Sequence, residues 1–313
     1  MKFLLSIFLL VLLFDLSFGL VTASEWTPIA IVDDYGYTVE ISTVPQKIVS
    51  LGPSSTEILF ALGLGDKVVG VTEYCNYPAE AQTKSIIGGI SSINIEKIVA
   101  LNPDIILANK MNGRDIISYL RKLGYTVLCF NSDSVNGTFS TIRRIGEATG
   151  ASIAAEELIT SLLQHLAVTA EQVKNTGATP LTVMHLMSTD PYWVSGTHVF
   201  QDELITLAGG KNAFPEVHGW GIINLEHLLI RDPDVILVDS GSNWKIRGDT
   251  LKQSLKNVLH LSSLISVKSN RIYVIDSDIF DRGGPRLADA FDKLVSFMYA
   301  NSIENSVVPN PKG

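Results

Sequence analysis

The sequence has few charged residues and no run of basic ones. Lys, Arg, Asp and Glu together make up 18% of its 313 residues, and the formal net charge is −8. Proteins that bind nucleic acid carry clustered Lys and Arg, because contacts to phosphate supply much of their affinity. The composition therefore argues against nucleic acid as a partner.

Cysteine is scarce as well, since only Cys75 and Cys129 are present. Two thiols are too few for a four-ligand metal site or for the disulfide framework of a small secreted domain. Both are expected at separate strand ends in the first half of the chain. We expect them to be unpaired, and a disulfide between them is the alternative in an exported protein.

The patterns typical of metal sites and enzymes are missing. The six histidines never stand at His-x-His or His-x-x-x-His spacing, so they predict no metal site. There is no Gly-x-Ser-x-Gly turn, and Gly63-Leu64-Gly65 lacks the third glycine of a dinucleotide-binding loop. We therefore expect no catalytic residues, no metal and no cofactor, and a protein that is not an enzyme.

The chain begins with an apolar segment. Residues 3–20 are rich in Leu, Phe, Ile and Val, and small residues follow up to Ser24. This pattern predicts a signal peptide over residues 1–23 and an extracytoplasmic location, in the periplasm or on the outer face of the cell membrane. An uncleaved anchor is the alternative, because the run nearly reaches spanning length, although Asp15 interrupts it. No Cys follows the run, which excludes a lipid anchor at this site.

One segment of the sequence occurs twice. Residues 93–108 read INIEKIVALNPDIILA and residues 223–238 read INLEHLLIRDPDVILV. In each copy an Asn can cap a helix, a Pro ends it, and a β-branched run continues as a strand. The interval is too long for a solenoid repeat. The repetition therefore predicts two related lobes.

Strands alternate with helices in both halves, which predicts parallel sheets with right-handed crossovers. Residues 152–174 carry apolar residues at helical spacing and predict one helix of roughly 35 Å. The expected fold class is α/β, with two similar Rossmann-like lobes joined by this long linker helix and a ligand cleft between them. The expected divisions are an N-terminal lobe over 24–137, a linker over 138–177 and a C-terminal lobe over 178–313.

Ligands of parallel α/β sheets bind beyond the carboxyl ends of the strands. The loops expected there are 52–55, 74–77, 88–92, 109–111, 190–193, 218–220, 239–244 and 278–286. They hold three of the four tryptophans, and a large aromatic side chain in a loop usually packs against something. We expect Trp193 and Trp220 to line a ligand site, and covering of the sheet edges is the alternative.

Glu96 and Glu226 occupy the same position in the two copies of the repeat. A carboxylate in the first helical turn stabilises the helix dipole, which would explain each glutamate alone. It does not explain why both lobes place one at the edge of the expected cleft. We therefore expect both glutamates to contact a partner protein.

Seven segments spread over the mature chain carry a family resemblance. They are KIVSLGPSSTEILFALG (47–63), VVGVTEYCNYP (68–78), GGISSINIEKIVALNPDIILA (88–108), WVSG (193–196), LAGG (207–210), GWGIINLE (219–226) and DRGGPR (281–286). Together they resemble the substrate-binding proteins of iron-siderophore and cobalamin ABC importers. Members of that family have two α/β lobes bridged by one helix and bind ligand between the lobes with little closure.

The resemblance implies roles for individual residues. Glu96 and Glu226 match two carboxylates that dock onto arginines of the membrane permease. The implied ligand-binding residues are Tyr74, Ile90, Asn109, Trp193, Trp220, Phe280, Asp281, Arg282 and Arg286. At Ile90 and Asn109 the chain departs from the best-known cobalamin binder, which carries tryptophans on these loops.

The resemblance thus implies a monomeric, extracytoplasmic component of an ABC importer that binds cobalamin or a related corrinoid and delivers it to a permease dimer. A ferric siderophore or haem is the alternative ligand. An anionic siderophore complex calls for more cations than the expected cleft offers, namely Lys110, Lys245, Arg247, Arg282 and Arg286. A more remote alternative is an exported two-lobe α/β enzyme that uses Asp281 and Arg282.

Overall fold

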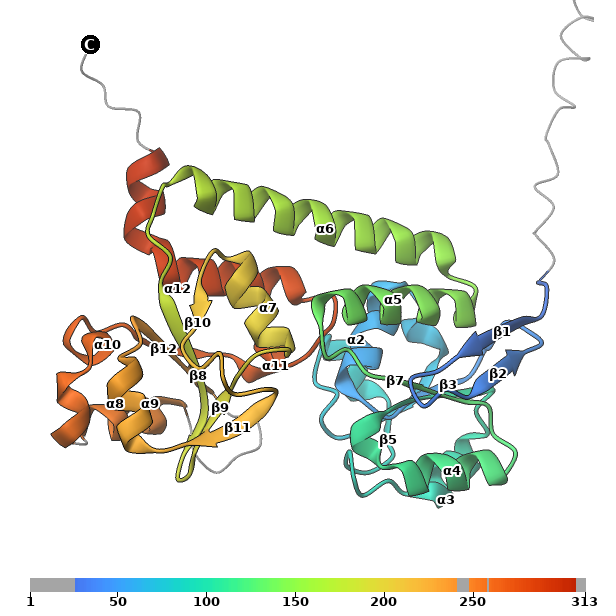
Figure 1. The fold of residues 1–313 in the computed structure, drawn as a ribbon. Helices are drawn as coiled ribbons and strands as arrows, with labels where there is room; N and C mark the ends of the chain where they lie inside the picture. Colours follow the sequence, from blue (N-terminus) through green and yellow to red (C-terminus); the bar gives the residue numbers. More distant parts are fainter. Residues whose placement is uncertain (1–25, 241–247, 258, 308–313) are drawn as a thin grey trace, which may run out of the picture.

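The computed structural model describes residues 26–240, 248–257 and 259–307 of the chain. Two lobes lie side by side, and a long helix, α6 (Ser152–Asn175), runs across both (Figure 1). The prediction of a single linker helix over 152–174 is confirmed. The predicted signal peptide (1–23), Lys245 and Arg247 lie outside the described residues.

The first lobe contains a parallel sheet with the strand order β5-β4-β3-β6-β7. Its strands are β3 (Ile48–Ser50), β4 (Val68–Val71), β5 (Ser85–Ile86), β6 (Ile105–Asn109) and β7 (Val127–Phe130). A hairpin of β1 (Ile29–Val32) and β2 (Thr38–Ile41) precedes them. Strands β3, β6 and β7 are almost entirely apolar because helices cover both faces of this sheet.

The connecting elements of this lobe follow the sequence pattern closely. The helices are α2 (Pro53–Ala61), α3 (Ile95–Leu101), α4 (Arg114–Lys122) and α5 (Val135–Thr149), with short turns η1 (Gly65–Lys67), η2 (Ala79–Thr83) and η3 (Lys110–Asn112). Helix α2 begins at Pro53, whose fixed φ suits a first helical position. Most of the loop expected over 52–55 is therefore part of this helix. Helix α5 was not predicted; it includes most of the segment before α6.

The second lobe contains a mixed sheet with the strand order β11-β9-β8-β12-β13, and β10 also pairs with β8. The strands are β8 (Thr182–Thr189), β9 (Tyr192–Ser195), β10 (Lys211–Asn212), β11 (Trp220–Ile223), β12 (Val235–Asp239) and β13 (Ile272–Ile275). Strands β9 and β11 are antiparallel to their neighbours. The prediction of a wholly parallel second sheet, with 190–193 and 218–220 as loops, is therefore wrong at this edge.

The helices of the second lobe are α7 (Phe200–Leu207), α8 (Leu225–Arg231), α9 (Gly248–Asn257), α10 (Ile265–Lys268), α11 (Ser277–Phe280) and α12 (Leu287–Val307), with the turn η4 (Leu259–Ser263). A backbone irregularity at Tyr299 divides α12 into two helical segments. The predicted α/β class with two lobes and a linker helix is confirmed.

The sequence repeat forms the same local structure in both lobes. The side chains of Asn94 and Asn224 cap α3 and α8 by accepting hydrogen bonds from the third helical N–H, at 2.9 and 2.7 Å. Both helices end at a left-handed residue, Asn102 with φ 46° and Asp232 with φ 41°. Asn and Asp tolerate this conformation better than other side chains do.

The Pro-Asp pair that follows each of these helices fixes the neighbouring strand. Asp104 accepts hydrogen bonds from the backbone N–H of Gln46 and Lys47, just before β3. Asp234 accepts hydrogen bonds from the backbone N–H and the hydroxyl of Thr182, at the start of β8. The repeat therefore determines the entry of a second strand in each lobe, which explains why this short motif persists in both copies.

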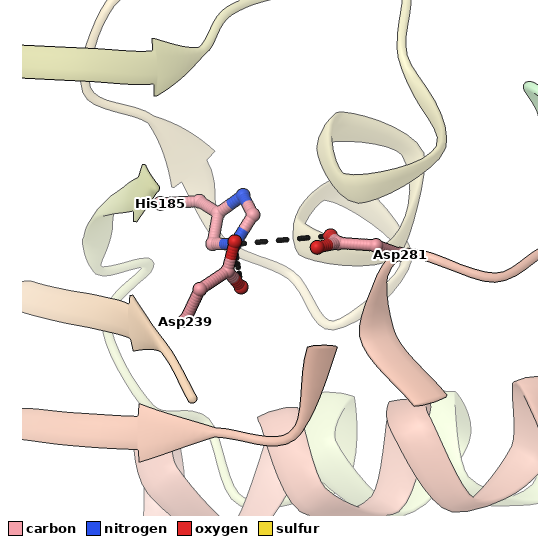
Figure 2. A group of neighbouring side chains, drawn as sticks. All are labelled: His185, Asp239 and Asp281. Carbon is pink, nitrogen blue, oxygen red and sulfur yellow. Dashed lines mark hydrogen bonds and ion pairs between the residues drawn. The ribbon is translucent and has the colours of Figure 1, made fainter. Parts of the chain in front are cut away.

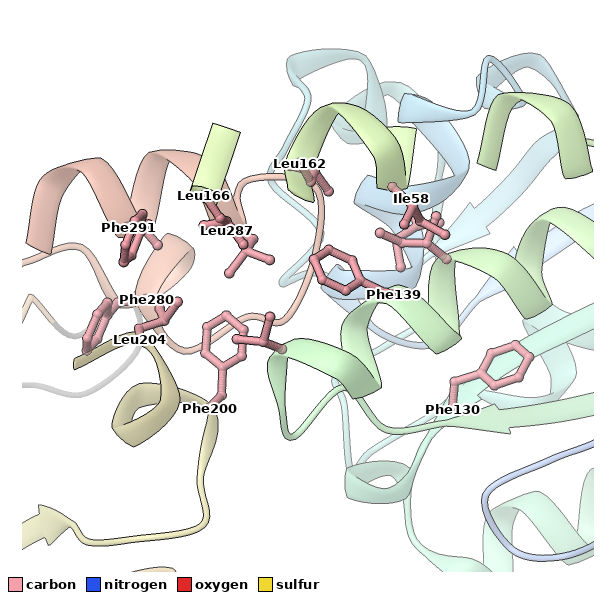
Figure 3. Packing of buried hydrophobic residues seen from close by; sticks show 14 of the residues in the cluster. Ile58, Phe130, Phe139, Leu162, Leu166, Phe200, Leu204, Phe280, Leu287 and Phe291 are labelled. Atoms are coloured by element: carbon pink, nitrogen blue, oxygen red, sulfur yellow. The ribbon is translucent and has the colours of Figure 1, made fainter. Parts of the chain in front are cut away.

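One apolar core runs through both lobes and beneath α6. Figure 3 shows its side chains from Ile58 and Phe139 of the first lobe, past Leu162 and Leu166 of α6, to Phe200 of the second lobe. Separate apolar clusters fill the opposite faces of the two sheets, under α3 and α4 in one lobe and under α8, α9 and α10 in the other. Helices α3 and α8 thus lie on the faces away from α6.

Both cysteines are free, buried thiols, as expected. Burial, together with the nearby carboxylates of Asp33 and Asp34, raises the pKa of Cys129 to about 12. Burial also raises the pKa of Cys75. Because the thiolate is the reactive form, neither cysteine has the character of a nucleophile.

Candidate functional site

The three ligand residues predicted in the first lobe lie at the carboxyl ends of neighbouring strands. Tyr74 follows β4, Ile90 follows β5 and Asn109 ends β6. The buried side chain of Asn112 joins the loops of Ile90 and Asn109 to the end of β3, because its amide donates to the carbonyl oxygens of Leu51 at 2.9 Å and Ile90 at 2.8 Å and its oxygen accepts from Asn109 N at 2.6 Å. The sheet therefore brings the three residues to one edge, and all three are partly exposed.

The Asn109 side chain holds the backbone in place at this edge of the sheet through two hydrogen bonds. The side chain accepts a hydrogen bond from Met111 N at 2.9 Å and donates one to the carbonyl oxygen of Phe130 at 3.2 Å. The adjacent Met111 is 69% exposed and makes no such bonds through its side chain. Met111 is thus an exposed apolar side chain at this edge of the sheet, and it was not among the predicted site residues.

Trp193 and Trp220 lie in the antiparallel strands β9 and β11 rather than in loops. Trp220 pairs with Ser195, and Trp193 pairs with Ile222, so both tryptophans project from the same face of the ribbon as diagonal neighbours. Trp193 is 38% exposed. Trp220 is partly buried, and its ring lies edge to face with His185 at a centroid distance of 5.6 Å. The ribbon therefore presents an aromatic surface held by strand pairing.

Beneath Trp220 lies a buried group of polar side chains. Figure 2 shows His185 of β8, Asp239 at the end of β12 and Asp281 after α11 converging from three elements. His185 Nε2 lies 2.9 Å from Asp239 Oδ1 and 4.0 Å from Asp281 Oδ1. Phe280 is fully buried and packs edge to face on the His185 ring, so it supports this group from within the core.

The electrostatics of this group are unusual for the chain. Burial, together with the neighbouring Asp239 carboxylate, raises the pKa of Asp281 to about 7. Burial lowers the pKa of His185, but the attraction of Asp239 and Asp281 outweighs it, and the net shift is upward. Near neutral pH the group therefore gains or loses protons easily.

The predicted ligand residues Arg282 and Arg286 are held in ion pairs between the lobes. Arg286 donates two hydrogen bonds to Glu57 of α2, and Arg282 contacts Glu57 and Asp278. Asn76 joins the group, accepting from Arg282 at 2.8 Å and donating to Asp278 at 2.6 Å. The guanidinium groups of Arg282 and Arg286 therefore already have acidic partners.

Two further contacts fix this junction. The backbone of Gly283 approaches the first lobe so closely that a Cβ there would lie 2.4 Å from the carbonyl oxygen of Ser132. Only glycine fits such an approach without displacing the backbone. Glu203 of α7 accepts a hydrogen bond from the backbone N–H of Val135 at 2.7 Å, at the first turn of α5. The segment DRGGPR is thus packed directly against the other lobe.

Glu96 and Glu226 are exposed, each in the first turn of its repeated helix. Within the described residues, neither carboxylate has an ion-pair partner. Both helices also expose apolar side chains, Val99 at 49% and Ile230 at 80%. Each lobe therefore presents a free carboxylate beside an exposed aliphatic residue.

Sequence reasoning did not name His185 or Glu57, and it included Asp239, Asn76 and Asp278 only as members of the expected loops 239–244, 74–77 and 278–286. Two signals were available for His185 and Asp239. His185 interrupts the otherwise apolar run of β8, and Asp239 stands where the first copy of the repeat has Asn109. Glu57 and Asn76 contact residues of the second lobe that are more than 200 positions away, and no local pattern predicts such contacts. None of the described helices has the length and apolarity needed to cross a membrane.

A sequence profile of the periplasmic binding protein family matches residues 48–279 of this chain. An uncharacterized ABC transporter substrate-binding lipoprotein of Bacillus subtilis is 33% identical over 287 residues, which cover 90% of this chain and 88% of the relative. A vitamin B12-binding protein of Yersinia pestis is 27% identical over 266 residues, which cover 83% of this chain and 90% of the relative.

Solved structures with the same arrangement are also found. The periplasmic heme-binding protein RhuT of Roseiflexus, in its apo form, superposes with a TM-score of 0.73 at 25% sequence identity. The superposition covers 82% of this chain and 99% of RhuT. The likeness therefore extends over both lobes and the linker helix.

Proposed function

The chain belongs to the periplasmic binding protein family and is a substrate-binding component of an ABC importer, and we propose that its substrate is cobalamin or a related corrinoid. The relative named as a vitamin B12-binding protein supports this substrate. The observation that carries the proposal is the aromatic face formed by Trp193 and Trp220. A flat macrocycle is a ligand whose faces match such a surface.

The ligand would contact both lobes. Trp193 and Trp220 supply the second lobe's surface, and Tyr74, Ile90 and the exposed Met111 supply the first lobe's. The side chains that supply this surface are mainly aromatic or aliphatic, as in most small-molecule sites, where few polar groups fix the orientation. Asn109 and Asp281 are polar groups that the family resemblance implies at this site.

The state of the two arginines favours a corrinoid over an anionic iron complex. Arg282 and Arg286 are paired with Glu57 and Asp278. An anionic siderophore would have to take these guanidinium groups from buried carboxylates, at a cost in free energy. Haem is the second candidate, because the structural relative RhuT is named a heme-binding protein.

We place Glu96 and Glu226 at the contact with the permease. Both are exposed and unpaired within the described part of the chain, and they occupy equivalent positions in the two lobes. A permease dimer with twofold pseudosymmetry can offer the same basic surface to each. The chain acts as a monomer outside the cytoplasm and is not an enzyme in this proposal.

A titration panel tests the substrate. Cobalamin, cobinamide, haem and ferric siderophores are added separately to the purified protein while tryptophan fluorescence is recorded. We expect cobalamin to bind one per chain and to quench the fluorescence strongly, because the corrin ring absorbs and would lie against Trp193 and Trp220. Tight siderophore binding with unchanged fluorescence would favour the alternative ligand, and chemical alteration of the recovered ligand would indicate an enzyme.

A further inference from the structure

The buried group under Trp220 has the composition of a metal-binding site. His185, Asp239 and Asp281 come from separate elements, and each directs one ligand atom toward the others. These three atoms all lie within 4.8 Å of one another. Within the described residues, no other group of three or more His, Cys, Asp or Glu side chains meets in this way.

We propose that His185 Nε2 and the carboxylates of Asp239 and Asp281 bind one divalent first-row transition-metal ion, with Zn²⁺ as the representative ion. Zinc binds His nitrogen at about 2.0–2.1 Å and carboxylate oxygen at about 2.0–2.2 Å. Ligand atoms around such an ion lie roughly 3–3.5 Å apart by simple tetrahedral geometry. The observed separations of 2.9 and 4.0 Å from His185 Nε2 bracket this value.

Neighbouring side chains hold two of the ligands in the required orientation. His185 Nδ1 lies 3.2 Å from Ser195 Oγ, so the hydroxyl can accept the Nδ1 proton and leave Nε2 facing the carboxylates. Gln201 donates its amide to Asp281 Oδ1 at 2.7 Å. Metal-binding histidines commonly donate their second ring N–H to such a partner, which fixes the tautomer and the ring position.

Charge provides a second reason. Two carboxylates and one imidazole lie close together, so the ionised forms of Asp239 and Asp281 repel each other. A buried like-charge pair is unfavourable unless a cation or a proton compensates for it. The raised pKa of Asp281 reflects this same repulsion together with burial. A divalent ion would neutralise both carboxylates at once.

The histidine–carboxylate contact between α6 and α12 lacks these properties. His165 and Asp292 lie 2.9 Å apart, but both side chains are more than 40% exposed and only one carboxylate is present. Water screens such a surface pair, so it needs no metal ion. This pair is therefore a matched control for the buried group.

The proposed ion would join three parts of the second lobe. It would tie β8 and β12 to the segment that follows α11, behind the face that carries Trp220. Three protein ligands leave a position for water or another donor. The ion is additional to the proposed corrinoid function and does not depend on it.

The experiment measures metal binding by the full chain after removal of metals with a chelator. Zn²⁺ alone is titrated by calorimetry, and Co²⁺ alone is followed by its visible absorption, which reports the coordination geometry. We expect one ion per chain. The Asp281→Asn and His185→Asn variants should lose the site, and Ser195→Ala should weaken affinity by about 10- to 100-fold through loss of the outer partner.

Asp281→Asn is the safer of the two ligand variants, because its side chain is 20% exposed whereas that of His185 is fully buried. Circular dichroism checks that each variant is folded. The double control His165→Asn with Asp292→Asn should bind Zn²⁺ as the unaltered protein does. Failure to bind one ion per chain, or binding that survives both Asp281→Asn and Ser195→Ala at full affinity, would overturn the proposal.

Cobalamin binding is measured in parallel on the metal-free and zinc-loaded protein. Cobalamin binding without any zinc binding would disprove the metal site alone. Zinc binding without cobalamin binding would support the metal site and count against the proposed substrate. The two proposals therefore fail separately.

Discussion

Arg286 of the second lobe donates two hydrogen bonds to Glu57 of the first lobe, from Nε to Oε2 at 2.8 Å and from Nη2 to Oε1 at 2.6 Å. The two residues are 229 positions apart in the sequence. The Glu57 side chain is only 2% exposed, and that of Arg286 is 14% exposed. Two planar groups are thus paired in a nearly dry interface, where the loss of one partner leaves the other charge buried.

Substitution of Glu57 should therefore destabilise the protein strongly. We expect Glu57→Gln to lower the free energy of unfolding by about 3–5 kcal/mol, because Arg286 and Arg282 lose their shared carboxylate. Denaturant titration followed by circular dichroism measures the change. The control is Glu156→Gln, which removes an exposed carboxylate from Arg143 and should cause little change. Equal effects of the two variants would mean that the inter-lobe pair adds nothing to stability.

Trp193 and Trp220 should contribute directly to corrinoid affinity. We expect each Trp→Ala variant to weaken cobalamin binding by about 1 kcal/mol or more, which is roughly fivefold. Fluorescence quenching and calorimetry measure the affinity. Trp26→Phe, at a residue that hydrogen-bonds Ile41 in the first lobe, should leave it unchanged. Losses below about twofold in both tryptophan variants would place the ligand elsewhere.

Asp281 should make stability depend on pH in metal-free buffer. The folded protein keeps the Asp281 proton up to about pH 7, whereas the ordinary pKa of 3.8 applies after unfolding. Between these values the folded state binds more protons, so its stability falls as pH rises, by at most about 1.4 kcal/mol per pH unit. Asp281→Asn removes this contribution, and its stability relative to the unaltered protein should increase over this range.

The measurement is a series of denaturant titrations from pH 4 to pH 8. The control is Asp115→Asn, at an exposed residue of α4, which reports the effect of losing a carboxylate from the surface. A constant difference between Asp281→Asn and the unaltered protein across the series would contradict the prediction.

Loading with ligand should move the lobes only slightly. Helix α6 has 24 residues, which is roughly 36 Å of continuous helix. Its side chains Ile159, Leu162 and Leu166 are buried in the core that both lobes share. We expect X-ray scattering curves of the ligand-free and loaded protein to be nearly superimposable. A large decrease in the radius of gyration would mean that α6 bends.

Substitution of the two exposed glutamates should impair delivery to the permease and leave ligand binding unchanged. We expect Glu96→Lys with Glu226→Lys to abolish transporter-coupled uptake while solution affinity for the ligand stays within about twofold, because surface charges govern docking. Each single variant should give an intermediate defect, and added salt should weaken the complex of the unaltered protein with the permease.

A matched charge reversal controls for net charge. Glu157→Lys with Glu171→Lys changes two exposed carboxylates on α6, on the other side of the molecule, and should leave uptake normal. Normal uptake by the Glu96 and Glu226 double variant would reduce both residues to helix-stabilising roles. Loss of ligand binding would place them in the ligand site instead.

Local signals made most of the fold predictable. Asn94 and Asn224 cap their helices as their sequence positions indicate, because a cap needs only a side chain and the next turn. The linker helix could be read from its apolar spacing for the same reason. Strands β9 and β11, at one side of the second sheet, were missed because each is short, and their pairing joins segments that no local pattern connects.

The candidate site was predicted only in part. Trp193 and Trp220 were singled out by residue type, but their strand positions were not foreseen. The group of His185, Asp239 and Asp281 was missed because metal-site rules rely on close spacing in sequence, and its first two members are 54 positions apart. Arg282 and Arg286 were taken as ligand residues from the family resemblance, and their pairing with Glu57 was not foreseen, because Glu57 lies more than 220 positions away in the sequence.

The apolar core shown in Figure 3 belongs to neither lobe alone. Leu162 and Leu166 of α6 pack in the same cluster as Ile58 of the first lobe and Phe200 of the second. A fragment that ended after the first lobe would expose its half of this cluster to water and lose the burial that stabilises it. The molecule should therefore melt as one calorimetric unit, and neither half can be excised as an independently folding domain.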